Sequence, residues 1–332
     1  MPRTDVTFPS GTGSCAAWLY TPTVSAESTA PATRPIVVMA HGLGGVKEER
    51  LDAFAERFTA AGYLCLVFDY RHFGASSGEP RRLLDIGRQR EDWKAAVAHA
   101  RTVDAADPDR VVVWGTSFGG GHAIVTAADD PRIAAAIAQC PFTDGLASST
   151  AVPPLTSLKL TARALADALG SRLGRAPVMV PTYGEPGSTA LMTAPDVVAG
   201  MARLLPPGAD CPKDVAARFA LDIIRDFPGR QAKNVACPIF FAVCERDSVA
   251  PPRPTQKYAR RPRARSGSTT PATSTSTSAR TSSATSPTSW TSSPATCPPP
   301  EHTPGTPVFR GRNRHAPLPP PCPATTSLAT PC

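Results

Sequence analysis

The stretch RVVVWGTSFGGGHAIVTAAD, residues 110–129, contains two different patterns of hydrophobic residues on either side of a short turn. Its first part is a continuous run of β-branched and aromatic residues, which is typical of a strand buried on both faces of a sheet. Its last part, from Gly119 onward, has the composition of a buried helix. The stretch therefore predicts a buried strand that turns sharply into a helix, the repeating unit of parallel α/β sheets.

The same alternation extends in both directions along the chain. Further buried strands are predicted at 35–40, 63–70, 132–142 and 238–247, helices at 47–62, 83–103 and 214–227, and an antiparallel hairpin at 5–22. Strands that alternate with helices are joined by right-handed crossovers, which place helices on both faces of the sheet. We therefore expect an α/β fold with a doubly wound, mostly parallel sheet.

The alternation lapses in the middle of the chain. Residues 143–214 are predicted to be an inserted cap over the carboxyl ends of the strands, where open α/β sheets bind ligands. An irregular connection between two strands is the alternative. The core is then split into residues 1–142 and 215–258, and residues 259–332 form a tail that is predicted to be disordered.

The net charge of the chain is concentrated near its C-terminal end. Residues 251–332 carry ten basic groups and one acidic group, which leaves 25 basic and 26 acidic groups for residues 1–250. The basic balance therefore does not indicate a surface for nucleic acid or membranes. The sequence shows no secretory signal pattern and no apolar run of about 18 residues. We expect a cytoplasmic protein that binds a small molecule.

The nine cysteines do not follow the spacing of a metal site. Those before residue 250 lie among apolar residues without a C-x-x-C pair, and they are Cys15, Cys65, Cys140, Cys211, Cys237 and Cys244. This pattern predicts buried free thiols rather than disulfides or zinc ligands. No motif in the chain calls for a metal or another cofactor.

The turn GTSFG, residues 115–119, matches the G-x-S-x-G nucleophile-elbow motif in the context that the motif requires, between a strand and a helix. A turn this tight pushes Ser117 out above the sheet as a candidate nucleophile. The backbone N–H of Phe118 would then point at the oxygen of a substrate under attack, with the positive end of the helix dipole behind it. A loop serine without a catalytic role is the alternative.

Two further segments complete the candidate site. HGLGG, residues 41–45, follows a buried strand where a second oxyanion donor is needed, and the N–H of Leu43 is the candidate. Asp247 ends the strand segment predicted at 238–247, just beyond its apolar part at 238–244, at the usual position of the acid that orients a catalytic histidine. A solvated loop aspartate is the alternative reading of Asp247.

Three histidines lie near these motifs, namely His41, His72 and His122. Each is interpreted as a residue that makes local hydrogen bonds and holds its loop or helix. A general-base role for His41 is the alternative, because it stands at the start of the glycine-rich turn.

These motifs together resemble the α/β-hydrolase superfamily, and within it bacterial serine hydrolases similar to dienelactone hydrolases, acetyl xylan esterases and Xaa-Pro dipeptidyl-peptidase-like proteins. The resemblance covers roughly residues 5–258 and rests on segments such as WGTSFGGGHA and CPIFFAVCERDSVAP. It implies a catalytic Ser, Asp and His in that order, with Ser117 and Asp247 as the first two. The family's histidine would follow the acid on a later loop.

The chain departs from the family at that histidine. It has no histidine between His122 and His302, and 24 of the 31 residues from Ser266 to Thr296 are Ser, Thr or Pro. This composition cannot build a hydrophobic core, so a disordered stalk is one interpretation. His302 and His315 lie farther along, in Pro-rich sequence.

A shifted reading frame is the second interpretation of this segment. Suppose that each codon of the original gene combined the third base of one codon in the present frame with the first two bases of the next. Because every Thr codon begins with AC, each Thr would then have been Tyr, His, Asn or Asp. A histidine could then span Ala272 and Thr273, about 25 residues after Asp247. An amphipathic helix would follow over 281–297, and a stop codon would fall at Glu301. On this hypothesis the chain has lost its general base and its last strand and helix.

The sequence thus predicts a serine hydrolase that cleaves an ester, thioester or amide through an acyl-enzyme on Ser117, impaired by the missing histidine. An acyltransferase of the same fold is one alternative. A non-catalytic binding protein, which retains the pocket without the chemistry, is the other.

Overall fold

The computed structural model describes residues 2–23, 33–205 and 213–260. The predicted tail 259–332 lies outside this part of the chain, except for its first two residues. His302, His315 and the segment of the hypothetical frameshift therefore also lie outside the described residues.

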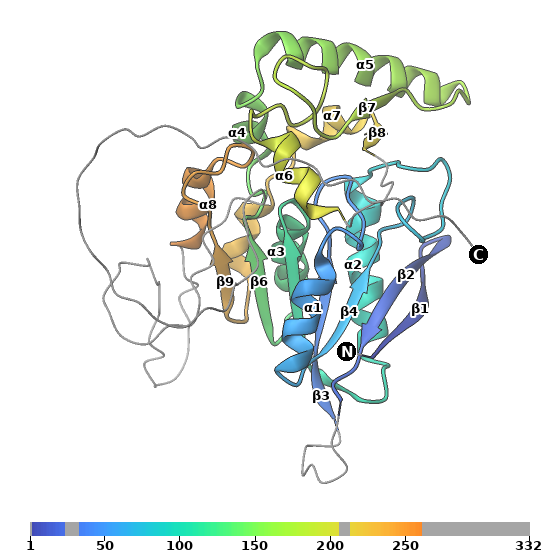
Figure 1. Ribbon diagram of the computed structural model, residues 1–332, viewed down its shortest axis with the longest axis vertical. Coiled ribbons are helices and arrows are strands. Elements are labelled where there is room, and N and C mark those ends of the chain that lie inside the picture. The colour runs from blue at the N-terminus through green and yellow to red at the C-terminus, as the bar shows by residue number, and fades with distance from the viewer. Residues whose placement is uncertain (1, 24–32, 206–212, 261–332) are drawn as a thin grey trace, which may run out of the picture. The chain divides into compact units, whose positions relative to one another are not determined.

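Seven strands form the main sheet, in the order β1-β2-β4-β3-β5-β6-β9 (Figure 1). They are β1 Arg3–Ser10, β2 Gly13–Tyr20, β3 Arg34–Ala40, β4 Leu64–Phe68, β5 Ala106–Thr116, β6 Ala135–Gln139 and β9 Ile239–Ala242. The hairpin β1–β2 is antiparallel, and β2 pairs antiparallel with β4. All other pairs are parallel, so the predicted mostly parallel sheet is confirmed.

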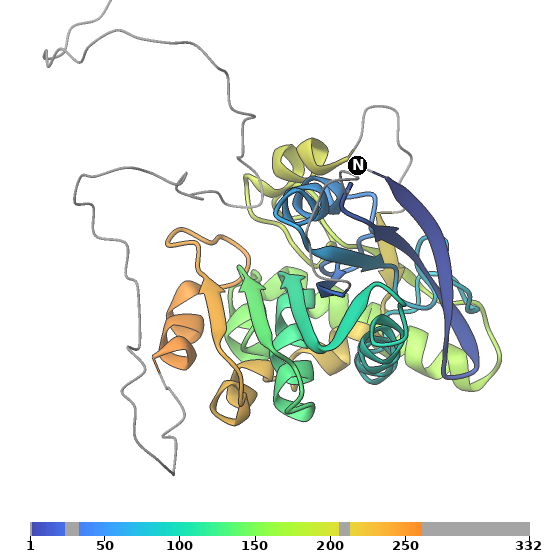
Figure 2. The ribbon, with the colours of Figure 1, turned by 90° about the horizontal axis from the view of Figure 1, so that it is seen from below.

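Helices cover both faces of this sheet. Helix α1 (Leu51–Ala60) lies on one face, and α2 (Ile86–Ala100) and α3 (Phe118–Asp129) lie on the other (Figure 2). Helix α8 (Pro252–Ala259) follows β9 near the edge of the sheet. The sheet is therefore doubly wound, as the alternation of strands and helices predicts.

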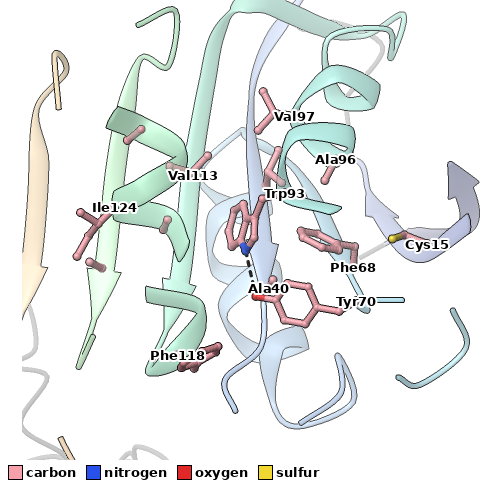
Figure 3. Close-up of a cluster of buried hydrophobic side chains, with 14 of the residues drawn as sticks. Cys15, Ala40, Phe68, Tyr70, Trp93, Ala96, Val97, Val113, Phe118 and Ile124 are labelled. Carbon is pink, nitrogen blue, oxygen red and sulfur yellow. Dashed lines mark hydrogen bonds between the residues drawn. The ribbon is translucent and has the colours of Figure 1, made fainter. Parts of the chain in front are cut away.

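The strand sequences explain why both faces are apolar. Along β3, Ile36 and Val38 belong to the hydrophobic cluster under α2 and α3, whereas Val37 and Met39 belong to the cluster under α1. Side chains alternate between the faces of a strand, so a continuous apolar run supplies both cores. In the larger core, Trp93 of α2 donates its indole N–H to the hydroxyl of Tyr70 at 3.0 Å (Figure 3).

Helix α1 begins later than its sequence predicts. The predicted helix starts at Lys47, but α1 starts at Leu51, after Arg50 in a left-handed conformation with φ 60°. The backbone N–H and the ammonium group of Lys47 both bind the carboxylate of Asp69, at 2.8 and 2.6 Å. These bonds hold Lys47 in the loop, so a tertiary contact overrides its helical propensity.

The region predicted as a cap contains one long helix, α5 (Pro154–Arg172), and several short elements. The short elements are α4 Gly145–Thr150, β7 Met179–Pro181, α6 Val197–Leu204 and, across the predicted boundary, β8 Asp214–Ala216, followed by α7 Phe219–Ile223 and a 3₁₀ helix, η1, at Pro228–Asn234. Helix α5 and the two-stranded sheet β7–β8 gather at one end of the main sheet (Figure 1). None of the helices in the described part of the chain is long and apolar enough to cross a membrane.

The prediction of one helix over 214–227 is wrong. Residues Asp214–Ala216 instead pair antiparallel with β7, and only the five-residue α7 follows. Val215 is fully buried, and Asp214 forms an ion pair with Arg82. The burial of Val215 and this ion pair hold the segment as a strand. The sequence pattern does not show this, because its apolar residues have the spacing of a helix.

Candidate active site

Ser117 occupies the turn between β5 and α3 in a backbone conformation that is rare for a residue with a side chain. Its φ is 52° and its ψ is −117°. A Cβ atom at Gly115 would lie 2.1 Å from the carbonyl oxygen of Gly119, and one at Gly119 would lie 2.4 Å from the carbonyl oxygen of His41. The two glycines therefore permit a turn that no other residue type would fit at these positions.

The end of β6 supports this turn through backbone hydrogen bonds. The N–H of Ser117 donates to the carbonyl of Gln139 at 2.9 Å, and the N–H of Phe142 donates to the carbonyl of Ser117 at 2.8 Å. Ser117 is thus held from both sides by the segment that contains Cys140. Strained backbone of this kind persists where surrounding bonds determine it, and it is typical of functional sites.

The glycine-rich turn after β3 lies directly against Ser117. A Cβ atom at Gly42 would stand 3.2 Å from the Cβ of Ser117 and 3.7 Å from its hydroxyl oxygen. This close approach brings the next residue, Leu43, to the same end of the sheet as Phe118. The structure therefore places three of the four predicted site residues in one neighbourhood.

Asp247 lies in the turn after β9. Its Oδ1 accepts hydrogen bonds from the N–H groups of Val249 at 2.9 Å and Ala250 at 2.7 Å. Burial raises the pKa of Asp247 above its usual value, although these two N–H groups act in the opposite direction. Asp247 also lies in a cluster with Cys140 and Cys244. A carboxylate oxygen of Asp247 and the two sulfur atoms are all within 4.8 Å of one another. Cys140 links this cluster to the backbone partners of Ser117.

The two fully buried histidines are bound to local partners. His41 shares a hydrogen bond of 3.0 Å with the carbonyl of Gly42, and its Nε2 lies 3.8 Å from Asp69. His122 contacts the amide oxygen of Gln89 at 2.9 Å. Burial lowers the pKa of both, that of His122 to about 3, so both rings are neutral at ordinary pH.

The other two histidines of the described region also have contacts away from Ser117. His72 contacts the carbonyl of Pro80 at 2.9 Å and the guanidinium group of Arg88 at 3.1 Å. His99 stacks on Phe8 with ring centroids 5.2 Å apart. Each histidine of the described residues therefore has a hydrogen-bond or stacking partner other than Ser117.

Sequence reasoning missed the importance of Asp69. Its side chain is fully buried, and it accepts from Lys47 and from the backbone N–H of Ala75 at 3.1 Å. It thereby joins the loop after β4 to the loop after β3 that contains Leu43. An aspartate directly after a buried apolar strand, as in LCLVFD, was the available signal.

A cavity of about 520 Å³ lies beside the glycine-rich turn. Gly44, Val46, Phe73 and Arg82 are among the residues that line it, whereas Ser117 and Asp247 are not. Thr182 of the region predicted as a cap and Val215, one residue beyond its predicted boundary, pack against Gly44, where an added Cβ would lie 2.4 and 3.0 Å from them. The region predicted as a cap therefore contacts the turn of Leu43 directly.

The doubly wound sheet with a serine at the strand-to-helix turn after β5 defines an α/β hydrolase. A family model described as "Serine aminopeptidase, S33" matches residues 31–270, and the chain belongs to this family of α/β hydrolases. The crystal structure of the α/β hydrolase GrgF from Penicillium sp. sh18 has the same fold, with a TM-score of 0.67 and 24% identity over 79% of this chain and 87% of that one.

Two curated relatives extend the comparison. The quorum-quenching protein AidA of Acinetobacter baumannii (strain MDR-ZJ06) is 58% identical over 255 residues, which are 77% of this chain and 82% of that protein. The polyketide transferase grgF of Penicillium sp. is 32% identical over 210 residues, which are 61% of this chain and 66% of the relative.

Proposed function

We propose that this protein is a serine hydrolase that transfers the acyl group of an ester, thioester or amide to Ser117 and then to water. The observation that carries the proposal is the strained backbone of Ser117 between two glycines that have no room for a side chain. A strand-to-helix turn of this geometry exposes the hydroxyl at the edge of the sheet.

The oxyanion of the tetrahedral intermediate would be held by two backbone N–H groups, those of Phe118 and Leu43. Phe118 is the first residue of α3, so its N–H belongs to the helix end where the dipole is positive. Leu43 follows Gly42, which lies against Ser117. Donors fixed before the reaction stabilise developing charge without reorganisation, and one such donor contributes about 2.7–4 kcal/mol.

Asp247 would orient the general base. Both of its backbone hydrogen bonds use Oδ1, so an imidazole N–H would be accepted at Oδ2. The described histidines all have local contacts, and none of them lies in the turn of Asp247. We therefore assign the base to a histidine that the printed sequence replaces with Ser/Thr/Pro-rich residues, and we expect this chain to be a weak catalyst.

One of the curated relatives suggests which substrates to test first. AidA is named for quorum quenching, so we propose a quorum-sensing signal with a hydrolysable acyl bond as the substrate class. The relative grgF is named as a polyketide transferase, which supports acyl transfer to another acceptor as the second candidate function. Both reactions share the acyl-enzyme on Ser117 and differ only in its acceptor.

Labelling with a fluorophosphonate probe tests the proposal. The full chain, its Ser117→Ala variant and a version with the reading frame restored near codon 260 are compared by intact mass. We expect fast labelling of Ser117 only in the restored version. If Ser117 of the full chain is labelled as fast as Ser117 of the restored version, another residue acts as the base. No labelling of the restored version would refute the serine mechanism.

A substrate panel separates hydrolysis from transfer. 4-Nitrophenyl esters of increasing acyl length are supplied to the restored version with and without an added alcohol. Hydrolysis gives only the free acid, whereas transfer gives the new ester in proportion to the alcohol. A new ester as the dominant product would replace the proposed hydrolase with the acyltransferase.

A further inference from the structure

Two cysteines meet where β6 and β9 end. Gln139 of β6 pairs with Ala242 of β9 as the last pair of their parallel ladder, and Cys140 donates its N–H to the carbonyl of Ala242 at 2.7 Å. Cys244 follows two residues after Ala242. The sulfur atoms of Cys140 and Cys244 are 2.7 Å apart, although 104 positions separate them in the sequence.

This contact is too close for a shared metal ion. Two thiolates bound to one zinc ion at about 2.3 Å in tetrahedral geometry lie about 3.8 Å apart. The sulfur atoms of Cys140 and Cys244 lie well inside that separation, and among the described residues Asp247 is the one further ligand in the cluster. Two sulfur atoms in direct contact are instead placed for a bond with each other.

The protonation of the pair favours the same chemistry. The hydrogen bond between the two sulfur atoms is the largest cause of a raised pKa for Cys140 and of a lowered pKa for Cys244. One sulfur of the pair can therefore ionise while the other keeps its proton. Cys244 is the less buried of the two, so it is the sulfur that an oxidant reaches first. A thiolate beside a thiol is the reactive form of a dithiol pair.

We propose that Cys140 and Cys244 are a redox site that forms a reversible disulfide between the ends of β6 and β9. With hydrogen peroxide as oxidant, the thiolate of Cys244 attacks one oxygen of the O–O bond, becomes a sulfenic acid and releases hydroxide, which takes up a proton to give water. The sulfur of Cys140 then attacks the sulfur of Cys244, loses its proton and displaces a second water. The two sulfur atoms together give two electrons to the peroxide.

The bond would fix the segments on both sides of the candidate active site. Cys140 stands between Gln139 and Phe142, the two residues that hold the backbone of Ser117, and Cys244 precedes the turn of Asp247 by three positions. A disulfide here ties these segments together and restricts the turn that carries Asp247. The redox site itself does not depend on the proposed serine chemistry.

The remaining described cysteines provide internal controls. Cys15 and Cys65 are fully buried, and burial raises the pKa of both thiols, that of Cys65 to about 12. Burial also raises the pKa of Cys237. These three thiols are therefore poor thiolates at neutral pH and should react slowly.

Peptide mapping of the full chain tests the redox site. The reduced protein is treated with hydrogen peroxide, its remaining thiols are blocked with N-ethylmaleimide, and its peptides are identified by mass spectrometry without reduction. We expect a cross-linked peptide that joins Cys140 to Cys244 and disappears after dithiothreitol. Persistent labelling of both cysteines by N-ethylmaleimide would overturn the proposal. So would zinc bound at one ion per chain that prevents the cross-link.

Variants and hydrogen exchange complete the test. Cys140→Ser and Cys244→Ser should each abolish the cross-link, whereas Cys237→Ser should leave it unchanged. In the oxidised wild-type protein the N–H groups of Val249 and Ala250 should exchange at least several-fold more slowly than in the reduced protein. Equal exchange would show that the disulfide does not restrict the turn of Asp247. None of these readouts involves Ser117, so they remain valid even if the proposed hydrolase activity fails.

Discussion

At the scale of single residues, glycines shape the candidate site as much as residues with side chains do. Gly115, Gly119 and Gly42 allow the backbone segments after β3 and after β5 to meet around Ser117. The motif G-x-S-x-G shows two of these glycines in the sequence. The contact between Gly42 and Ser117 is visible only in the fold.

Replacement of Gly119 by Ala should destabilise the protein. Its new Cβ would stand 2.4 Å from the carbonyl oxygen of His41, and neither backbone segment can move without disturbing the sheet. We expect a loss of at least about 1–3 kcal/mol in the free energy of unfolding, measured by urea denaturation.

Gly170→Ala is the matched control for Gly119→Ala. Gly170 lies inside α5, and its added Cβ would meet Arg175 at an ordinary 3.6 Å. This variant should be neutral or slightly more stable than the wild type, because Ala favours a helix over Gly. Equal stability of the two variants would contradict the steric account of the turn.

Glu49 should make the stability of the protein depend on pH. Burial, followed by the negative charges of Asp69 and Glu48, raises the pKa of Glu49 to about 7. The folded state thus binds a proton that the unfolded state has already lost, so the free energy of unfolding falls as pH rises from the usual carboxyl value through about 7. Glu49→Gln should remove this part of the decrease.

Urea denaturation at about pH 5 and about pH 8 measures that difference, with Glu56→Gln as the control because Glu56 is an exposed carboxylate on α1. A Glu49→Gln variant that keeps the full pH dependence of the wild type would show that Glu49 is ionised in the folded protein.

At the scale of elements, a buried charge pair joins the hairpin, α2 and the loop after β4. The fully buried carboxylate of Asp92 accepts from the hydroxyl of Ser10 at 2.6 Å and from the guanidinium group of Arg71 at 2.5 Å. Arg71 also binds Glu91, which is 61% exposed, at 2.8 Å. The same arginine therefore has one buried and one exposed acidic partner.

Asp92→Ala should cost about 3–5 kcal/mol in the free energy of unfolding, because it removes the buried carboxylate partner of Arg71 and the acceptor of the Ser10 hydroxyl. Glu91→Ala should cost less than about 1 kcal/mol, since water screens an exposed pair. Thermal or urea unfolding of the two variants measures both values. A larger loss in Glu91→Ala would mean that Arg71 is held mainly from the solvent side.

At the scale of the whole molecule, the sheet of the described residues ends in a short strand with an exposed aromatic side chain. β9 has four residues, and Phe240 is 61% exposed, whereas every residue of the inner strand β4 is buried. A further strand and helix, which the restored reading frame would supply, would cover this edge. We therefore expect the restored version to have the higher melting temperature.

Phe240→Ser distinguishes this effect from general stabilisation. In the printed chain the substitution should change the melting temperature little, because Phe240 already faces solvent. In the restored version it should lower the melting temperature by several degrees, since a buried aromatic side chain contributes about 3–5 kcal/mol when lost. Equal effects in both versions would argue against coverage of this edge by the restored segment.

The sequence by itself determined the order of strands and helices around Ser117, because continuous apolar runs and glycine-flanked turns are local signals. It also indicated Ser117, Phe118, Leu43 and Asp247 as candidates, since each lies in a turn at the carboxyl end of a predicted strand. The strand Asp214–Ala216, the start of α1 at Leu51 and the buried role of Asp69 could not be predicted in this way. Each is set by partners far away in the sequence, and such contacts override local propensity. The meeting of Cys140 and Cys244 has the same origin, because only the register between β6 and β9 decides which residues follow side by side where those strands end.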